Sequence, residues 1–199
     1  MKILNLYAGI GGNRKLWGDE HEITAVEYKP EIAKIYQDFF PNDKVIVADA
    51  HEYLLKHFAE FDFIWSSPPC QSHSSFRQNI CVRYRGTEPV YPDMSLYQEI
   101  LFLRHNAKCD WVVENVKPYY ESLIKPDFIL QRHYFWSNKK IADKKFETDL
   151  IRKSQIPQLQ EKTGFDLSGY RLKNKRQVLR NCVSPEVGKY ILKSLLNNS

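Results

Sequence analysis

The sequence predicts a three-layer α/β domain that has a mainly parallel sheet with helices on both faces. Short apolar stretches begin near residues 3, 23, 45, 61 and 111, and amphipathic stretches such as 30–39 and 51–57 lie between them. This alternation is typical of βα units. The apolar stretches lead into glycine, acidic or proline residues, as expected where ligands gather at the carboxyl ends of parallel strands. We expect residues 1–199 to form one domain.

The first apolar stretch ends at Tyr7 and runs directly into Ala8-Gly9-Ile10-Gly11-Gly12. Glycines here let the backbone approach a ligand, and a strand, a glycine turn and a following helix hold nucleotide-like cofactors in α/β proteins. The spacing differs from the dinucleotide fingerprint, because Arg14 stands three positions after Gly11. A nicotinamide dehydrogenase is therefore a poor match.

The next two stretches each lead to an acid. Residues 23–26 are followed by Glu27, about where this architecture places a carboxylate that receives ribose hydroxyls, and residues 45–48 are followed by Asp49. An ordinary surface carboxylate is the alternative for Glu27. Helical patterns are expected over 30–39 and 51–57, and again over 95–105 and 185–196.

The fourth stretch, residues 61–65, leads to Pro68 and Pro69, and Cys70 follows at once. Two prolines stop a strand and stiffen its exit, so we expect Cys70 on a rigid support where a thiol could act as a nucleophile. A small buried apolar side chain is the alternative for a lone cysteine. The fifth stretch, residues 111–113, leads to Glu114-Asn115-Val116, which predicts a carboxylate at the same edge as Cys70.

Taken in order, these motifs resemble those of the DNA (cytosine-5)-methyltransferase family. The segments that resemble its first, fourth, sixth and last motifs are Tyr7-Ala8-Gly9-Ile10-Gly11-Gly12, Pro68-Pro69-Cys70-Gln71, Glu114-Asn115-Val116 and Arg180-Asn181-Cys182-Val183-Ser184-Pro185. The compact chain is most similar to small stand-alone members of phage type. The resemblance implies a Rossmann-like methyltransferase fold that depends on S-adenosylmethionine, with a late antiparallel strand near residues 134–136.

The resemblance also implies a reaction, the methylation of carbon 5 of cytosine in DNA. Cys70 would add to carbon 6 of a cytosine flipped out of the duplex, and Glu114 would pair with ring nitrogen 3 and the exocyclic amine. Tyr7 would present its aromatic face to the sulfonium of S-adenosylmethionine, although core packing is an equally ordinary use for it. The other cofactor positions implied are Gly9, Gly11 and Gly12 for close approach, Glu27 for ribose, Asp49 for the adenine amine, and Asn181 to brace the pocket, with a helix cap as its alternative.

Three departures from the family limit what the resemblance implies. Only the short segment 138–155 stands where the family places a large target-recognition region, which predicts short or relaxed site specificity. The eighth motif is reduced to residues 130–134, where Arg132 is our choice for the arginine near the base and His133 is the alternative. Arg180 replaces the glycine of the last motif.

Charge is concentrated late in the chain. The net charge is +5, and residues 132–180 hold eight Lys and five Arg against five Asp or Glu. Such a balance favours phosphate contact, with a solvated surface as the alternative. The resemblance implies that the loop from Cys70 to about Pro92 closes over the flipped base. We expect DNA contacts from Gln71, Arg77, Arg83, Arg85, Lys139, Lys140, Lys144 and Lys145, with these four lysines exposed.

The four cysteines show no CxxC pair and no zinc-like spacing, so we expect no metal. Reduced thiols, the lack of a signal-like segment and the lack of a long apolar run predict a cytoplasmic protein of a bacterium or a phage-infected cell, without a membrane partner. Two other functions stay open. One is methylation of cytosine in RNA such as tRNA, and the other is a non-catalytic nucleic-acid-binding subunit on the same fold. The oligomeric state and a recognition partner are not predicted.

Overall fold

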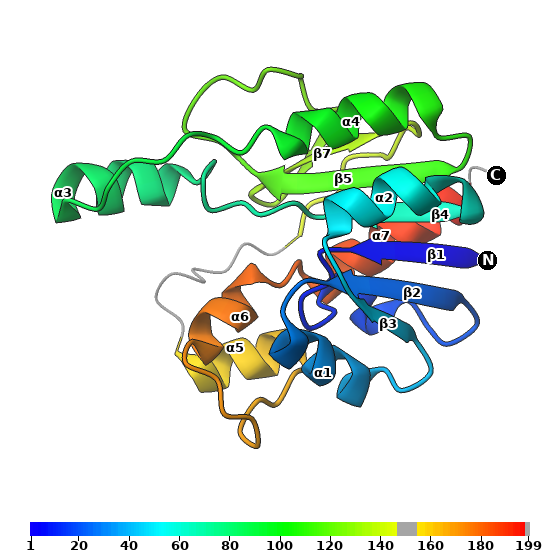
Figure 1. Ribbon diagram of the computed structural model, residues 1–199, viewed down its shortest axis with the longest axis horizontal. Coiled ribbons are helices and arrows are strands. Elements are labelled where there is room, and N and C mark those ends of the chain that lie inside the picture. Colours follow the sequence, from blue (N-terminus) through cyan, green and yellow to red (C-terminus); the bar gives the residue numbers. More distant parts are fainter. Residues whose placement is uncertain (147–154, 198–199) are drawn as a thin grey trace.

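A computed structural model of the chain describes residues 1–146 and 155–197. Its seven strands form one mixed sheet in the order β3-β2-β1-β4-β5-β7-β6 (Figure 1). The strands are β1 (Lys2–Leu6), β2 (Glu22–Glu27), β3 (Lys44–Val47), β4 (Phe63–Ser66), β5 (Asp110–Val116), β6 (Phe128–Leu130) and β7 (His133–Ser137). The three-layer Rossmann-like prediction is confirmed.

The direction of β7 decides which residues reach the ligand-binding edge. β1 to β5 are parallel, whereas β7 runs antiparallel to β5, as the resemblance implied. His133 at the start of β7 pairs with Val116, and Ser137 at its end pairs with Val112. The start of β7 therefore lies at the carboxyl edge of the parallel strands, and its end lies toward the opposite edge. The short β6 was not predicted.

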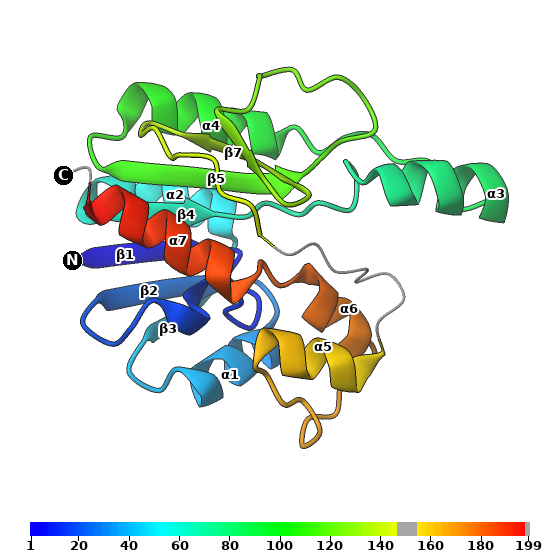
Figure 2. The same ribbon diagram turned by 180° about the vertical axis from the view of Figure 1, so that it is seen from behind.

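Helices cover both faces of the sheet (Figures 1 and 2). The α-helices are α1 (Pro30–Phe39), α2 (Ala50–His57), α3 (Arg83–Arg85), α4 (Ser95–Asn106), α5 (Ile156–Thr163), α6 (Lys175–Asn181) and α7 (Pro185–Leu196). α2 and α4 bury their apolar sides against Leu4, Ile64 and Trp111, and α7 packs on Ile3 and Trp65 from the other face. α1 shares a third apolar cluster with α5 and α6.

Three short helical segments complete the fold: η1 (Asn13–Leu16), η2 (Phe58–Glu60) and the π-helical η3 (Arg77–Val82). A single 3₁₀ turn, η1, follows the glycine turn. The expected loop after Cys70 instead contains η3 and α3, which project from the body of the molecule (Figure 1). α5 and α6 were not predicted.

Local sequence explains the ends of several helices. The Asp49 side chain caps α2 by accepting hydrogen bonds from the amides of His51 and Glu52, and Pro30 and Pro185 begin α1 and α7. Gly164 ends α5 in the left-handed conformation that favours glycine. Within residues 1–146 and 155–197, no helix is both long enough and apolar enough to cross a membrane.

Candidate active site

The carboxyl ends of β1, β4 and β5 are joined directly by hydrogen bonds. Asn115, near the end of β5, donates its side-chain amide to the carbonyl oxygen of Pro68 at 3.0 Å. The amide of Ser67 donates to the carbonyl oxygen of Leu6 at 3.4 Å. The segments resembling the first, fourth and sixth motifs are thus brought to one edge of the sheet, as the sequence predicted.

Cys70 and Glu114 interact electrostatically at this edge. Burial raises the pKa of Glu114 to about 7. A hydrogen bond from Ser67 and the charge of Arg132 lower this pKa, but burial is the larger effect. Burial, and then the charge of Glu114, raises the pKa of Cys70 to about 11, again opposed by Arg132. Near neutral pH the free protein therefore holds a protonated thiol, and Glu114 keeps its proton to a higher pH than an exposed glutamate does.

Arg132 and His133 both lie beside Glu114 but differ in environment. His133 is buried, its Nε2 is 3.6 Å from Oε1 of Glu114, and burial lowers its pKa to about 3. His133 is therefore neutral and forms no ion pair with Glu114. Arg132 is exposed, and its Nη2 donates to the carbonyl oxygen of Arg180 at 3.3 Å. Arg132 thus supplies the positive charge near the thiol and the carboxyl group.

The three glycines of the first motif have different surroundings. A Cβ atom added to Gly9, whose φ is +56°, would meet no atom within 4 Å. A Cβ atom on Gly11 would lie 2.3 Å from the ring of Phe40, and one on Gly12 would lie 2.7 Å from the Cβ of Cys182. Gly9 therefore borders open space, whereas Gly11 and Gly12 permit close packing within the protein.

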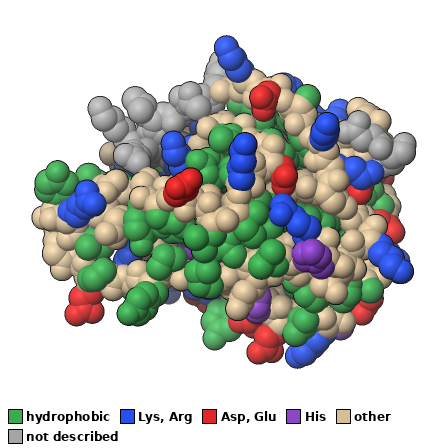
Figure 3. Space-filling view, turned by 90° about the horizontal axis from the view of Figure 1, so that it is seen from above, with side chains coloured by type: hydrophobic (Ala, Val, Ile, Leu, Met, Phe, Trp, Pro, Cys, Tyr) green, Lys and Arg blue, Asp and Glu red, His purple; other side chains and the backbone are tan. Residues whose placement is uncertain are grey.

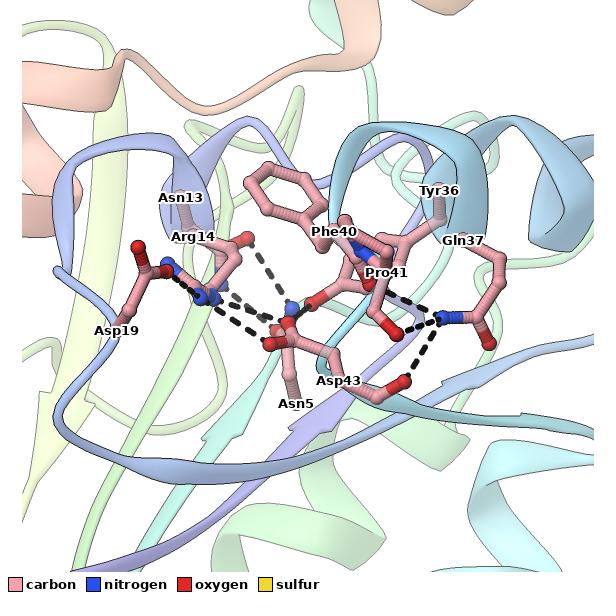
Figure 4. Close-up of polar contacts among 9 residues, drawn as sticks. All are labelled: Asn5, Asn13, Arg14, Asp19, Tyr36, Gln37, Phe40, Pro41 and Asp43. Carbon is pink, nitrogen blue, oxygen red and sulfur yellow. Dashed lines mark hydrogen bonds and ion pairs between the residues drawn. The ribbon is translucent and has the colours of Figure 1, made fainter.

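A buried polar cluster holds the glycine turn against α1 (Figure 4). Arg14 donates from Nε and Nη2 to the two carboxylate oxygens of Asp43 at 2.9 and 3.1 Å, and Tyr36 donates to the same carboxylate at 2.8 Å. Asn13 donates to the side chain of Asn5 on β1 at 2.8 Å. Arg14, which only excluded a dinucleotide fingerprint in the sequence, thus fixes the position of the turn.

The predicted acids at the ends of β2 and β3 contact backbone amides. Glu27 accepts hydrogen bonds from the amides of Gly9 and Lys29, both at 3.0 Å. Asp49 is exposed and uses Oδ1 to cap α2. Asn181 is exposed at the end of α6, and Ser184 rather than Asn181 is the N-cap of α7.

Tyr7 follows β1 in a left-handed backbone conformation, with φ of +54°. Its hydroxyl group donates to Glu99 on α4, a buried acid that sequence reasoning missed. The available signal was position, because Glu99 shares the buried side of α4 with Leu96, Ile100 and Leu103. A non-glycine residue with positive φ is uncommon and is found preferentially at functional sites.

S-adenosylmethionine fits the residues at this edge. Gly9 leaves open space for a ligand, Glu27 and Asp49 place carboxylates beside it, and Tyr7 adds an aromatic ring at the end of β1. Carboxylates at the ends of β2 and β3 suit hydroxyl and amine donors, and an aromatic ring suits a cation.

The arginines predicted to contact DNA lie on the projecting segment. Arg83 and Arg85 are exposed on α3, Arg77 donates to the carbonyl oxygen of Glu88, and Gln71 is exposed beside Cys70. Tyr84, between the two arginines, is 81% exposed. Figure 3 shows hydrophobic side chains extending over this face of the molecule.

The predicted lysines lie elsewhere. Lys139 follows β7 and forms an ion pair with Asp110, at the start of β5, so it lies toward the edge opposite Cys70. The prediction that all four lysines are exposed is wrong for Lys139, which is half-buried. Lys140 and Lys145 are exposed, and exposed Lys144 lies 4.9 Å from the ring centroid of Tyr190. Residues 147–154 of the segment 138–155 lie outside the described residues.

Comparison with known proteins identifies the family and the fold of the chain. Residues 1–118 match the family model of the C-5 cytosine-specific DNA methylase. No curated protein matches the chain. The fold is similar to that of the methyltransferase EhMeth from Entamoeba histolytica, with a TM-score of 0.61 and 11% identity over 100% of this chain and 98% of that chain. A Spodoptera frugiperda DNMT2 variant matches with a TM-score of 0.47 and 22% identity over 73% of this chain and 53% of that chain, so the chain spans about half the length of that protein.

The family model matches more than half of the chain, which is enough to assign the chain to a family. It covers residues 1–118 of 199 and includes the glycine turn, Cys70 and Glu114. The strand order and the three hydrogen-bonded strand ends agree with it. The chain belongs to the C-5 cytosine-specific DNA methylase family, whose cofactor is S-adenosylmethionine.

Proposed function

We propose that the chain is a DNA (cytosine-5)-methyltransferase that acts through a covalent cysteine adduct, with short or relaxed site specificity. The observation that carries this proposal is the 3.0 Å hydrogen bond from Asn115 to the carbonyl oxygen of Pro68, which joins the segment of Cys70 to the end of β5 where Glu114 lies. Residues 1–199 would form one methyltransferase domain, with 138–155 as a much shortened recognition segment.

The proposed steps follow from the protonation of the two central residues. The Cys70 thiol passes its proton to solvent water, and its sulfur forms a bond with carbon 6 of a flipped cytosine as the double bond between carbons 5 and 6 opens. The protonated form of Glu114, which its raised pKa makes available near neutral pH, donates to ring nitrogen 3 and so neutralises the charge that enters the ring. Bound S-adenosylmethionine supplies an electrophilic methyl group for carbon 5. Carbon 5 then loses its proton to water, and nitrogen 3 returns its proton to Glu114. The bond between sulfur and carbon 6 breaks, so that Cys70 leaves as a thiolate and the ring double bond re-forms.

Other residues bind and orient. Arg132 would stabilise the thiolate and the base, because its charge lowers the pKa of both Cys70 and Glu114. The proposed cofactor-binding residues are Tyr7, Gly9, Gly11, Gly12, Glu27, Asp49 and Asn181, with Gly9 in direct contact and with Gly11 and Gly12 acting through the packing of the turn. Gln71, Arg77, Arg83 and Arg85 are the proposed DNA contacts near the nucleophile.

Trapping with 5-fluorocytosine tests the proposal. Fluorine at carbon 5 cannot leave as a proton, so the Cys70 adduct should survive denaturation and migrate with the DNA on a denaturing gel. The matched control is Cys70→Ala, which should form no adduct and transfer no methyl group, yet bind S-adenosylmethionine as the wild type does. An active wild type without adduct, or an active Cys70→Ala variant, would remove the covalent mechanism. The same assay with RNA tests the substrate, and methyl transfer to RNA alone would replace DNA in the proposal.

A further inference from the structure

Glu99 is a buried carboxylate that the proposed steps leave unexplained. It lies on α4 and is 1% exposed. Its Oε1 accepts a hydrogen bond from the Tyr7 hydroxyl group at 2.5 Å and lies 2.9 Å from Nδ1 of His51. Its Oε2 accepts a hydrogen bond from the Ser66 hydroxyl group at 2.6 Å. Three polar partners thus surround one buried side chain.

The three partners come from different elements around the candidate cofactor site. Tyr7 follows β1, His51 lies in the first turn of α2, and Ser66 ends β4, four positions before Cys70. Figure 1 shows α2 and α4 on the same face of the sheet above these strands. Two hydroxyl donors and one imidazole nitrogen thus contact the two oxygens of a single buried side chain, and the hydrogen bond with Glu99 raises the pKa of His51.

Several acidic side chains act on Tyr7 at the head of β1, and His51 is the basic group in contact with the nearest of them, Glu99. Burial raises the pKa of the Tyr7 hydroxyl group far above its usual value, and the charge of Glu99 raises it further, followed by those of Asp49 and Asp93. Tyr7 therefore stays neutral while three carboxylates act on its position. Charges act over longer distances in a buried, poorly polarisable region than in water.

We propose that Glu99 is a positioning residue whose buried charge makes the head of β1 favour a cationic cofactor over its neutral product. This inference rests on the proposed function. S-adenosylmethionine carries a sulfonium charge, whereas S-adenosylhomocysteine, the product of methyl loss, has a neutral thioether. A negative potential stabilises the first ligand and leaves the second unaffected, while hydrogen bonds to Tyr7 and Ser66 orient the site for both.

Calorimetric titration of the two ligands separates the charge from the shape of the site. Glu99→Gln keeps the length of the side chain and removes its charge. The Kd of S-adenosylmethionine should rise about tenfold, equivalent to ~1.4 kcal/mol, while that of S-adenosylhomocysteine changes by less than about twofold. The matched control is Glu52→Gln on α2, an exposed carboxylate paired with Lys56 at 3.7 Å, which should change neither Kd.

Glu99→Asp keeps the charge and changes the length of the side chain. The shorter side chain loses hydrogen bonds, so the binding of both ligands should weaken together. The ratio of the two Kd values should stay that of the wild type. If Glu99→Gln raised both Kd values by the same factor, the ratio of the two would stay that of the wild type. This result would overturn the inference and leave the proposed function intact. Failure of the wild type to bind either ligand would overturn the proposed function itself.

A second variant keeps the test open should Glu99→Gln fail to fold. Glu99→Met combined with Tyr7→Phe and Ser66→Ala removes the charge together with two of its donors, so that no hydroxyl group is left without a partner. The remaining partner, His51, has a partly exposed side chain, so water can take the place of Glu99 there, and replacing buried polar partners together by apolar residues of similar shape is often neutral for stability. The Kd ratio should shift as in Glu99→Gln, and a wild-type ratio in the folded triple variant would refute the role of the charge.

Discussion

Glu114 combines a chemical role with an unusual protonation state. Its carboxyl group is 6% exposed, and burial is the largest cause of its raised pKa. Glu114→Gln preserves the shape of the side chain but cannot give up a proton to the base. Because general acid–base groups contribute about 100-fold to 10,000-fold, the rate of methyl transfer should fall within that range while the Kd of S-adenosylmethionine stays constant. A loss of less than about tenfold in single-turnover assays would show that Glu114 is structural.

The same residue predicts a pH dependence of stability. The pKa of Glu114 is about 7 in the folded protein, above its usual value of 4.5, so the folded state binds the proton more tightly than the unfolded state. The stabilisation is complete below about pH 4.5 and is lost as the pH rises through 7. As the pH rises over this interval, the free energy of unfolding of the wild type, measured by urea titration, should fall by up to about 3 kcal/mol relative to that of Glu114→Gln. If the difference in the free energy of unfolding between the wild type and Glu114→Gln did not change with pH, the pKa of Glu114 would be the same in the folded and unfolded states.

At the scale of the element, the glycine turn makes two kinds of contact. Gly9 borders open space, and Gly86 at the end of α3 has a similar left-handed backbone, with φ of +65° and no atom within 4 Å of an added Cβ atom. Gly9→Ala and Gly86→Ala should therefore cost similar stability, about 1 kcal/mol each. Only Gly9→Ala should weaken the binding of S-adenosylmethionine, with a Kd that rises by about tenfold or more. Equal Kd values for the two variants would place the cofactor away from Gly9.

The projecting segment η3–α3 is the element we expect to meet DNA. Arg83 and Arg85 are exposed there, whereas Lys144 and Lys145 follow β7 on a different part of the surface. The double variants R83Q/R85Q and K144Q/K145Q remove the same charge. If each arginine neutralises one phosphate, the arginine variant should reduce the slope of log affinity against log salt by about 1.8, and the lysine variant should leave it unchanged. Equal losses, measured by fluorescence anisotropy on duplex DNA, would indicate a diffuse electrostatic contact.

For the whole molecule, the sequence predicted most of the sheet and the edge that carries the site. Apolar stretches and the turn residues that follow them located β1 to β5. These signals depend only on residues that are close together in the sequence. The antiparallel β7 came from family resemblance alone. β6, with three residues, is too short to give a periodic signal, and α5 follows a segment of low apolar content.

The missed features depend on contacts between distant residues. No local pattern shows that Gly12 packs on Cys182 rather than on a ligand, or that Arg14 meets Asp43. The position of Lys139 relative to Cys70 could not be predicted from the sequence, because it depends on the direction of β7, which leads the chain away from the edge where Cys70 lies. Charge counted along a sequence gives the amount of basic surface but not its location.

The close packing of the first motif on the last has a consequence for the order of folding. Gly12 approaches Cys182, and a Cβ atom on Gly188 of α7 would lie 2.2 Å from the carbonyl oxygen of Asn13. The final shape of the glycine turn therefore depends on contacts between segments about 170 positions apart. Contacts of such long sequence separation form late and slowly. During synthesis, the nascent chain should acquire affinity for S-adenosylmethionine only after α7 has left the ribosome.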